Sequence, residues 1–416
     1  MCSSDLYGET WTKIVNGVDA THFARAVRED PKRAKLLYLG TEHGIYVSFD
    51  DGANWQSLKQ NLPDTPVHDI AVEERDLVIA THGRGFYIMD NVSPLRQGGI
   101  QTTTNFHLYK PEDALRGLDR SAAIDYYLKQ PAQKITMEFL DASGKVIRSF
   151  TGTPADAERR QGAQAAAGGG DEEGFRRPPD PHPPVTAGLH RITWDLRYPG
   201  ATDFPGMIMW AASTRGPIAP PGAYSVRVTA DGQTETQPFA IKREPHVLAT
   251  VSDQDLREEF DLAMNVRNRV TQADEAVLLA RGIKAQIAER KAKLDAKAAP
   301  IAKALDDLDQ AIGAVEGEIY QVKLQSSQDP LNFPIKLNNK IAALQGVIES
   351  ADVRPTEQTY SVFRTLSNSL DEQLAKLDAV VKSKLPAVNQ LLQRQKLDPI
   401  KAEPLKTDAA KTTSQP

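Results

Sequence analysis

The sequence predicts a multidomain chain that is β-rich first and α-helical afterwards. Three observations lead to this prediction: a motif repeated at the spacing of one propeller blade, alternating segments with glycine-bearing hairpin turns, and heptad-spaced apolar residues in the last part. We therefore expect an incomplete β-propeller of about two blades, then a β-sandwich, then an antiparallel helical bundle.

Composition limits the possible function classes. The 416 residues contain 50 Lys and Arg against 55 Asp and Glu, so the strongly basic surface of a nucleic-acid-binding protein is not expected. No apolar run approaches the roughly 20 residues that cross a bilayer. The only cysteine is Cys2, which excludes an internal disulfide and a thiolate zinc site. The histidines lack close metal-ligand spacing and no nucleotide fingerprint occurs, so we predict no metal and no cofactor.

The first six residues look foreign to the rest of the chain. The string Cys-Ser-Ser-Asp-Leu matches the translation of a common sequencing adapter. We interpret residues 1–6 as an artefact and expect the natural protein to continue upstream.

Residues 7–110 are predicted to form the propeller blades. SDLYGETW at 4–11 and SFDDGANW at 48–55 align Ser, Gly and Trp, with Gly8 and Gly52 separated by 44 positions, about one blade. LLYLGTEHGIYVSFD resembles the later DLVIATHGRGFYIMD, and each reads as strand, glycine turn and strand.

The octapeptide SFDDGANW predicts a structural hairpin rather than an acid pair. Asp50 can accept hydrogen bonds from turn amides, Gly52 supplies a positive φ, and Trp55 can pack between sheets. With Ser48, these residues form a pattern that resembles the Asp-box (BNR) β-propeller proteins, which include sialidases, xyloglucan-cleaving hydrolases and sortilin-type receptors. In the earlier copy, Leu6 stands at the aspartate position.

The resemblance implies which turns face a ligand. In that family the box fills the turn between the third and fourth strands of a blade, and successive turns alternate between the two ends of the blade. The turns with Glu42, His43, His82 and Arg84 would then lie at the opposite, ligand-binding end, which makes these four residues the candidates for ligand contact. The alternative is that they are solvated residues of tight turns. We predict no catalytic residue in this chain.

Residues 111–248 are predicted to form the β-sandwich. Alternating segments at 134–150, 189–198 and 223–241 include two glycine-bearing hairpins. They resemble the Ig-like module of flagellar hook-capping proteins. Residues 153–187 are poor in large apolar side chains and are predicted to be a disordered insert.

Residues 249–400 are predicted to form the bundle, and 401–416 a disordered tail. The clearest helix has apolar residues at steps of four and three: Ile301, Leu305, Leu308, Ile312, Val315, Ile319 and Val322. Pro386 is expected to kink or end the last helix.

The order of domains resembles the rear part of large bacterial proteins that are labelled glycosyl hydrolase or sortilin-like. The resemblance implies an exported, periplasmic or extracellular protein, in which this chain is a ligand-binding or scaffold module for a glycan or a protein. The alternative is a glycoside hydrolase whose catalytic residues lie upstream, since such enzymes use a pair of carboxylates across the ligand site.

Overall fold

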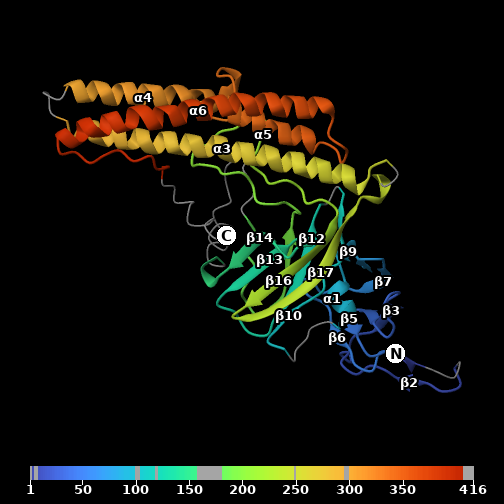
Figure 1. The fold of residues 1–416 in the computed structure, drawn as a ribbon. Helices are drawn as coiled ribbons and strands as arrows, with labels where there is room; N and C mark the ends of the chain where they lie inside the picture. Colours follow the sequence, from blue (N-terminus) through green and yellow to red (C-terminus); the bar gives the residue numbers. More distant parts are fainter. Residues whose placement is uncertain are drawn as a thin grey trace.

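The computed structural model describes residues 2–3, 8–98, 104–117, 120–156, 180–247, 250–294 and 299–405. The predicted combination of β-sheets and helices is confirmed, with β-sheets in the N-terminal part and four long helices in the C-terminal part (Figure 1). Most of the proposed artefact (1 and 4–6), the central part of the expected insert (157–179) and the end of the expected tail (406–416) lie outside the described residues.

Two antiparallel sheets near the N-terminus share one hydrophobic core. The first has the order β3-β4-β5-β6 and the second the order β7-β8-β9, and a short pair, β1 and β2, precedes them. Tyr38 and Val47 of the first sheet and Ile70 and Ile79 of the second are buried in the common core. The strands are β1 (Cys2–Ser3), β2 (Thr12–Lys13), β3 (Ala24–Glu29), β4 (Leu37–Thr41), β5 (Gly44–Ser48), β6 (Gln56–Ser57), β7 (Val67–Val72), β8 (Leu77–Thr81) and β9 (Phe86–Met89).

The β4–β5 turn and the β8–β9 turn lie at the same end of these sheets. Gly40 is so close to β7 that a Cβ at this position would come within 2.7 Å of the carbonyl oxygen of Val67. Val67 in turn pairs with Thr81. Because Gly40 and Thr81 each lie just before their turns, the two turns are neighbours. We call this end of the two sheets the turn end.

The middle of the chain forms two facing sheets with a shared core. A five-stranded sheet has the order β11-β17-β16-β13-β14, and a three-stranded sheet has the order β10-β12-β15. Trp194 is fully buried between them and stacks on Phe139 with ring centroids 4.4 Å apart. The strands are β10 (Phe106–Leu108), β11 (Ala114–Arg116), β12 (Ala122–Leu128), β13 (Ile135–Leu140), β14 (Val146–Gly152), β15 (Gly188–Trp194), β16 (Gly222–Ala230) and β17 (Gln233–Arg243).

Four long helices lie side by side along the other side of the molecule (Figure 1). They share one apolar core, because each presents a stripe of buried aliphatic residues to its neighbours. The helices are α3 (Asp253–Ala292), α4 (Ala299–Ile319), α5 (Leu337–Ile348) and α6 (Glu357–Arg394); the shorter ones are α1 (Ser93–Arg96), η1 (Pro245–Val247) and η2 (Asp329–Leu331).

The apolar stripe of α4 is shorter than expected, and of the two effects expected of Pro386, a kink or an end of the helix, the end does not occur. The expected apolar stripe of α4 is buried as far as Ile319, where the helix ends, so Val322 is outside it and 51% exposed. Tyr320 is buried at this end and packs edge-on against Phe204. Pro386 does not end α6, which continues to Arg394.

Residues 401–405 lie along α3 instead of extending away from it. The main chain of Lys401 exchanges two hydrogen bonds with the side chain of Gln286, and the amide of Leu405 donates to the carbonyl of Leu278 at 2.9 Å. Gly282 lets this segment approach, because a Cβ there would meet the carbonyl oxygen of Glu403 at 2.2 Å.

A buried charge cluster joins the facing sheets to the helices. Arg116 of β11 is about 1% exposed and its guanidinium donates to Glu259 of α3 and, at 3.2 Å, to Asp352. It also donates to the carbonyls of Ile218 and Ala219. Burial raises the pKa of Glu259 to about 7, although Arg116 acts in the opposite direction.

Candidate functional site

The hairpin at 48–55 is held by hydrogen bonds among Ser48, Asp50, Gly52 and Asn54. The Ser48 hydroxyl donates to Asp50 Oδ1 at 2.8 Å and accepts from the Gly52 amide at 2.9 Å. Asn54 donates to Asp50 twice, from its amide at 2.8 Å and from its side chain at 2.7 Å. Gly52 has a φ of +83°, which favours glycine. The carboxylate of Asp50 therefore fixes a turn, and its hydrogen bonds to Asn54 lower its pKa.

Trp55 anchors this hairpin to the preceding segment. Its side chain is only 4% exposed and packs with Leu39 and Tyr46. Its indole N–H donates to the carbonyl of Ile14 at 3.2 Å, and its amide donates to that of Asn16 at 2.8 Å. The hairpin follows the end of β5 that is remote from the turn end, so its acidic pair does not approach the candidate ligand residues.

The two turns at the turn end share the same local construction. The hydroxyl of Thr41 donates to the Gly44 carbonyl at 2.9 Å, and the hydroxyl of Thr81 donates to the Gly85 carbonyl at 2.7 Å. Each threonine thus closes a glycine turn from inside its strand. The sequence similarity between the segments therefore has a common physical basis in turn chemistry.

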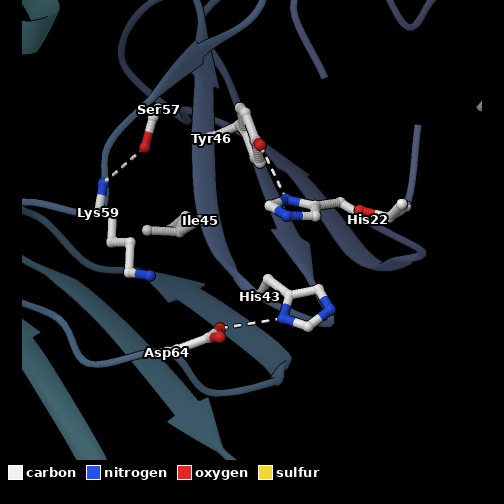
Figure 2. A pocket seen from close by; sticks show the side chains of 8 residues that line it. His22, His43, Ile45, Tyr46, Ser57, Lys59 and Asp64 are labelled. Atoms are coloured by element: carbon white, nitrogen blue, oxygen red, sulfur yellow. Dashed lines mark hydrogen bonds and ion pairs between the residues drawn. The ribbon is translucent and has the colours of Figure 1, made fainter. Parts of the chain in front are cut away.

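An open pocket of about 190 Å³ lies beside the first of these turns (Figure 2). His43 contributes its ring, and its Nδ1–H donates to Asp64 Oδ1 at 3.0 Å. The ring of His22 lies 4.8 Å from that of His43, and its Nδ1 forms a hydrogen bond of 2.8 Å with the Tyr46 hydroxyl. The lining residues are Thr21, His22, His43, Ile45, Tyr46, Ser57, Lys59 and Asp64.

Of the four candidates from the sequence, His43 alone lines this pocket. Glu42 points into an ion pair with Arg25, whose Nε donates to it at 2.7 Å. His82 belongs to the neighbouring turn and stacks on His68 with ring centroids 5.3 Å apart. Arg84 is exposed in the same turn. The candidates therefore share one end of the sheets but not one cavity.

Reasoning from the sequence missed six polar lining residues, namely Thr21, His22, Tyr46, Ser57, Lys59 and Asp64. His22, Tyr46, Lys59 and Asp64 come from separate loops and strands, and no motif connects them. The only local signal is that each lies within about twenty-five residues of His43 in a short-strand region, which does not single them out.

The electrostatics of the pocket are set by its carboxylate. The hydrogen bond from His43 lowers the pKa of Asp64, and the charge of Lys59 acts in the same direction. Asp19, beside the pocket, also has a lowered pKa because the amide and hydroxyl of Thr21 donate to it. Both carboxylates are therefore ionised at neutral pH, and neither is poised to give a proton.

The pocket can bind a polar ligand without chemical reaction. Its lining combines hydroxyl groups, imidazole nitrogens and one ammonium group, while Asp64 is its only carboxylate. Most glycosidases use two carboxylates across the scissile bond, and these lining residues offer one. Within the described ranges, no group of three or more His, Cys, Asp or Glu side chains is arranged to hold a metal ion.

A second pocket, of about 220 Å³, lies where β14 and β15 meet the residues 195–198 and 215–216. Its charged groups are largely engaged with each other. Arg148 pairs with Asp180, and Arg197 donates to Glu349 at 2.8 Å and to the Gly216 carbonyl. These groups connect segments of the fold, so we do not assign a ligand to this pocket.

No protein-family model matches the sequence, and no curated protein is significantly similar to it. None of the helices in the described part of the chain is long and apolar enough to cross a membrane.

Proposed function

We propose that this chain is the C-terminal part of an exported Asp-box propeller protein and acts as a ligand-binding or scaffold module. In this proposal the first two sheets are propeller blades, the facing sheets are an Ig-like sandwich, and the four helices are an antiparallel bundle. The ligand is a glycan or a protein segment held at the turn end.

The observation that supports binding most directly is the pre-oriented polar lining of the pocket. Asp64 holds His43 and Tyr46 holds His22, each through Nδ1. Fixing side chains before the ligand arrives lowers the entropy cost of binding. Each ring also keeps its Nε2 for a ligand, since no hydrogen bond to these atoms occurs among the described residues.

The hairpin at 48–55 supports the propeller part of the proposal. Its residues have the roles that their spacing predicts. The Ser48 hydroxyl donates to Asp50 and accepts from the Gly52 amide, Gly52 has a positive φ, and the side chain of Trp55 is buried. The pattern is thus used as a structural unit.

The unpaired edge of β9, the outer strand of the second sheet, supports the proposal that the set of propeller blades is incomplete. Among the described strands, β9 has a neighbour on one side only, namely β8. Phe86 and Ile88, on one face of β9, are 77% and 60% exposed. Exposed apolar side chains on an open strand are unfavourable in an isolated protein, and a further blade would cover them.

Binding of the chain to an immobilised library of glycans and peptides tests the functional proposal. We expect at least one ligand to bind, and Lys59→Ala to weaken it several-fold because the substitution removes the only ammonium group of the pocket. Lys32→Ala is the matched control, since Lys32 lies beyond the opposite end of β3. Equal binding by both variants would place the ligand elsewhere and contradict the proposal.

The same experiment addresses the hydrolase alternative. Any glycan that binds is incubated with the chain and with a longer protein that contains more blades, and release of reducing ends is measured. Hydrolysis by the longer protein alone would favour the glycoside hydrolase.

A further inference from the structure

Half of the histidines in the chain gather at the turn end. The sequence has eight histidines. His22 stands beside His43 with ring centroids 4.8 Å apart, and His68 beside His82 with centroids 5.3 Å apart. One loop connects the two pairs, because Asp64 accepts from His43 while its neighbour Thr65 donates to the His82 carbonyl. We call these four residues the histidine face.

The fixed charges around the histidine face cancel. Four cations and four carboxylates come from the elements around it, so the formal charge is zero while the histidines are neutral. These groups are Arg25 and Arg28 of β3, Lys59 after β6, Arg84 of the β8–β9 turn, Asp19 before β3, Glu42 of the β4–β5 turn, Asp64 before β7 and Asp69 of β7.

The carboxylates of this surface are engaged, whereas two of its cations are not. Glu42 pairs with Arg25, Asp69 with Arg28 and Asp64 with His43, and Asp19 accepts from Thr21. In the part of the chain that the structure describes, Lys59 and Arg84 form no ion pair. Protonation of the four histidines would therefore raise the net charge of this surface to as much as +4, and Lys59 and Arg84 are included in that sum.

Close pairing of the rings couples protonation to the binding of an anion. Histidine side chains generally take up a proton between about pH 5 and 8. Two imidazolium ions at these separations repel each other, so the doubly protonated pair is unfavourable on its own. A carboxylate bound beside the pair relieves this repulsion. Because binding and protonation are linked, each proton taken up on binding strengthens binding by up to tenfold for every unit by which the pH falls.

The lining of the pocket favours a sugar acid over an acidic peptide. Hydroxyl groups of Thr21, Tyr46 and Ser57 line the same pocket as the His22–His43 pair and can pair with sugar hydroxyls. The cavity of about 190 Å³ is smaller than sites for drug-sized molecules, which suits one ring of a longer chain. We propose that the histidine face binds carboxylated glycans in acid and releases them at neutral pH. This inference rests on the proposed ligand-binding function.

The test measures binding of trigalacturonate and of neutral galactotriose to the whole chain by calorimetry at pH 5.5 and 7.5. We expect trigalacturonate to bind at least about tenfold more tightly at pH 5.5, because protonation of about one histidine is coupled to binding. Galactotriose should show no such dependence. The double variant His22→Gln/His43→Gln should lose the pH dependence, and His246→Gln, whose side chain is 92% exposed on η1, should retain it.

The possible results separate the two proposals. Binding of trigalacturonate that is equal at both pH values, or that keeps its pH dependence in the double variant, overturns the inference alone. If hexaglutamate binds in acid and trigalacturonate does not bind, the ligand is an acidic peptide and not a glycan, which overturns the inference. If none of these probes binds at either pH, the inference fails. The proposed ligand-binding function is then decided by the experiment with the immobilised library of glycans and peptides. Thermal unfolding of both glutamine variants at pH 7.5 confirms that they fold.

Discussion

Replacing Asp274 by asparagine should stabilise the helices at alkaline pH and hardly affect them in acid. Asp274 lies in α3 and is 0% exposed. Its Oδ1 accepts a hydrogen bond of 3.1 Å from Asn338 of α5, while its Oδ2 has no partner in the described part of the chain. Burial raises the pKa of Asp274 to about 7, because the ionised form loses its hydration.

The sign and size of the effect follow from this pKa. The folded state holds the proton more tightly than the unfolded state, whose pKa is near 3.8. Stability is therefore highest in acid and falls as the pH rises from about 4 through about 7. A difference of about 3 units corresponds to ~4 kcal/mol, which is the upper limit of the loss above about pH 8. Asparagine is neutral at every pH and avoids this loss.

Urea unfolding followed by circular dichroism at 222 nm measures the difference. We expect Asp274→Asn to raise the free energy of unfolding by ~2–4 kcal/mol at pH 8.5 and to change it by less than ~1 kcal/mol at pH 4. Asp261→Asn, at an exposed position of the same helix, should have little effect at either pH. Equal destabilisation by Asp274→Asn at both pH values would refute the reasoning, because it would show that the site needs the carboxylate.

Three further predictions concern other parts of the chain. Asp50→Ala should lower the stability of the N-terminal sheets by ~2–3 kcal/mol in thermal unfolding, because three hydrogen bonds to this side chain are lost, and a loss below ~0.5 kcal/mol would contradict the structural role of the hairpin. Arg116→Met should cost ~3–5 kcal/mol by leaving the buried Glu259 without its cation and Asp352 with Arg120 alone, and Arg120→Met, at a more exposed site, should cost much less in the same urea assay. Phe86→Lys combined with Ile88→Lys should reduce self-association of the chain in light scattering, and a parent chain that is already monomeric at high concentration would contradict an aggregation-prone β9.

Local chemistry made part of this protein predictable from its sequence. The hairpin at 48–55 works through residues within seven positions of each other, so spacing alone indicates which groups can bond. The stripe of α4 is equally local, because helical periodicity places Ile301 to Ile319 on one face. Features of this kind need no knowledge of the remaining chain.

The pocket depends on contacts between separate segments and was not predictable in the same way. His22 approaches His43 only because β3 pairs with β4, and Asp64 reaches it from the loop before β7. The end of α4 has a similar cause: Tyr320 is held by the segment near Phe204 and Ile208, which is more than one hundred residues away in the sequence. Periodicity carries no information about such partners.

Imidazole resonances in two-dimensional NMR test most directly whether the turn end binds a ligand. The chain is titrated with the tightest ligand from the library, and the side-chain signals of all histidines are followed. We predict that the signals of His22 and His43 shift together along one saturating curve while that of His246 stays unchanged. Saturable binding that leaves both His22 and His43 unaffected would contradict the account.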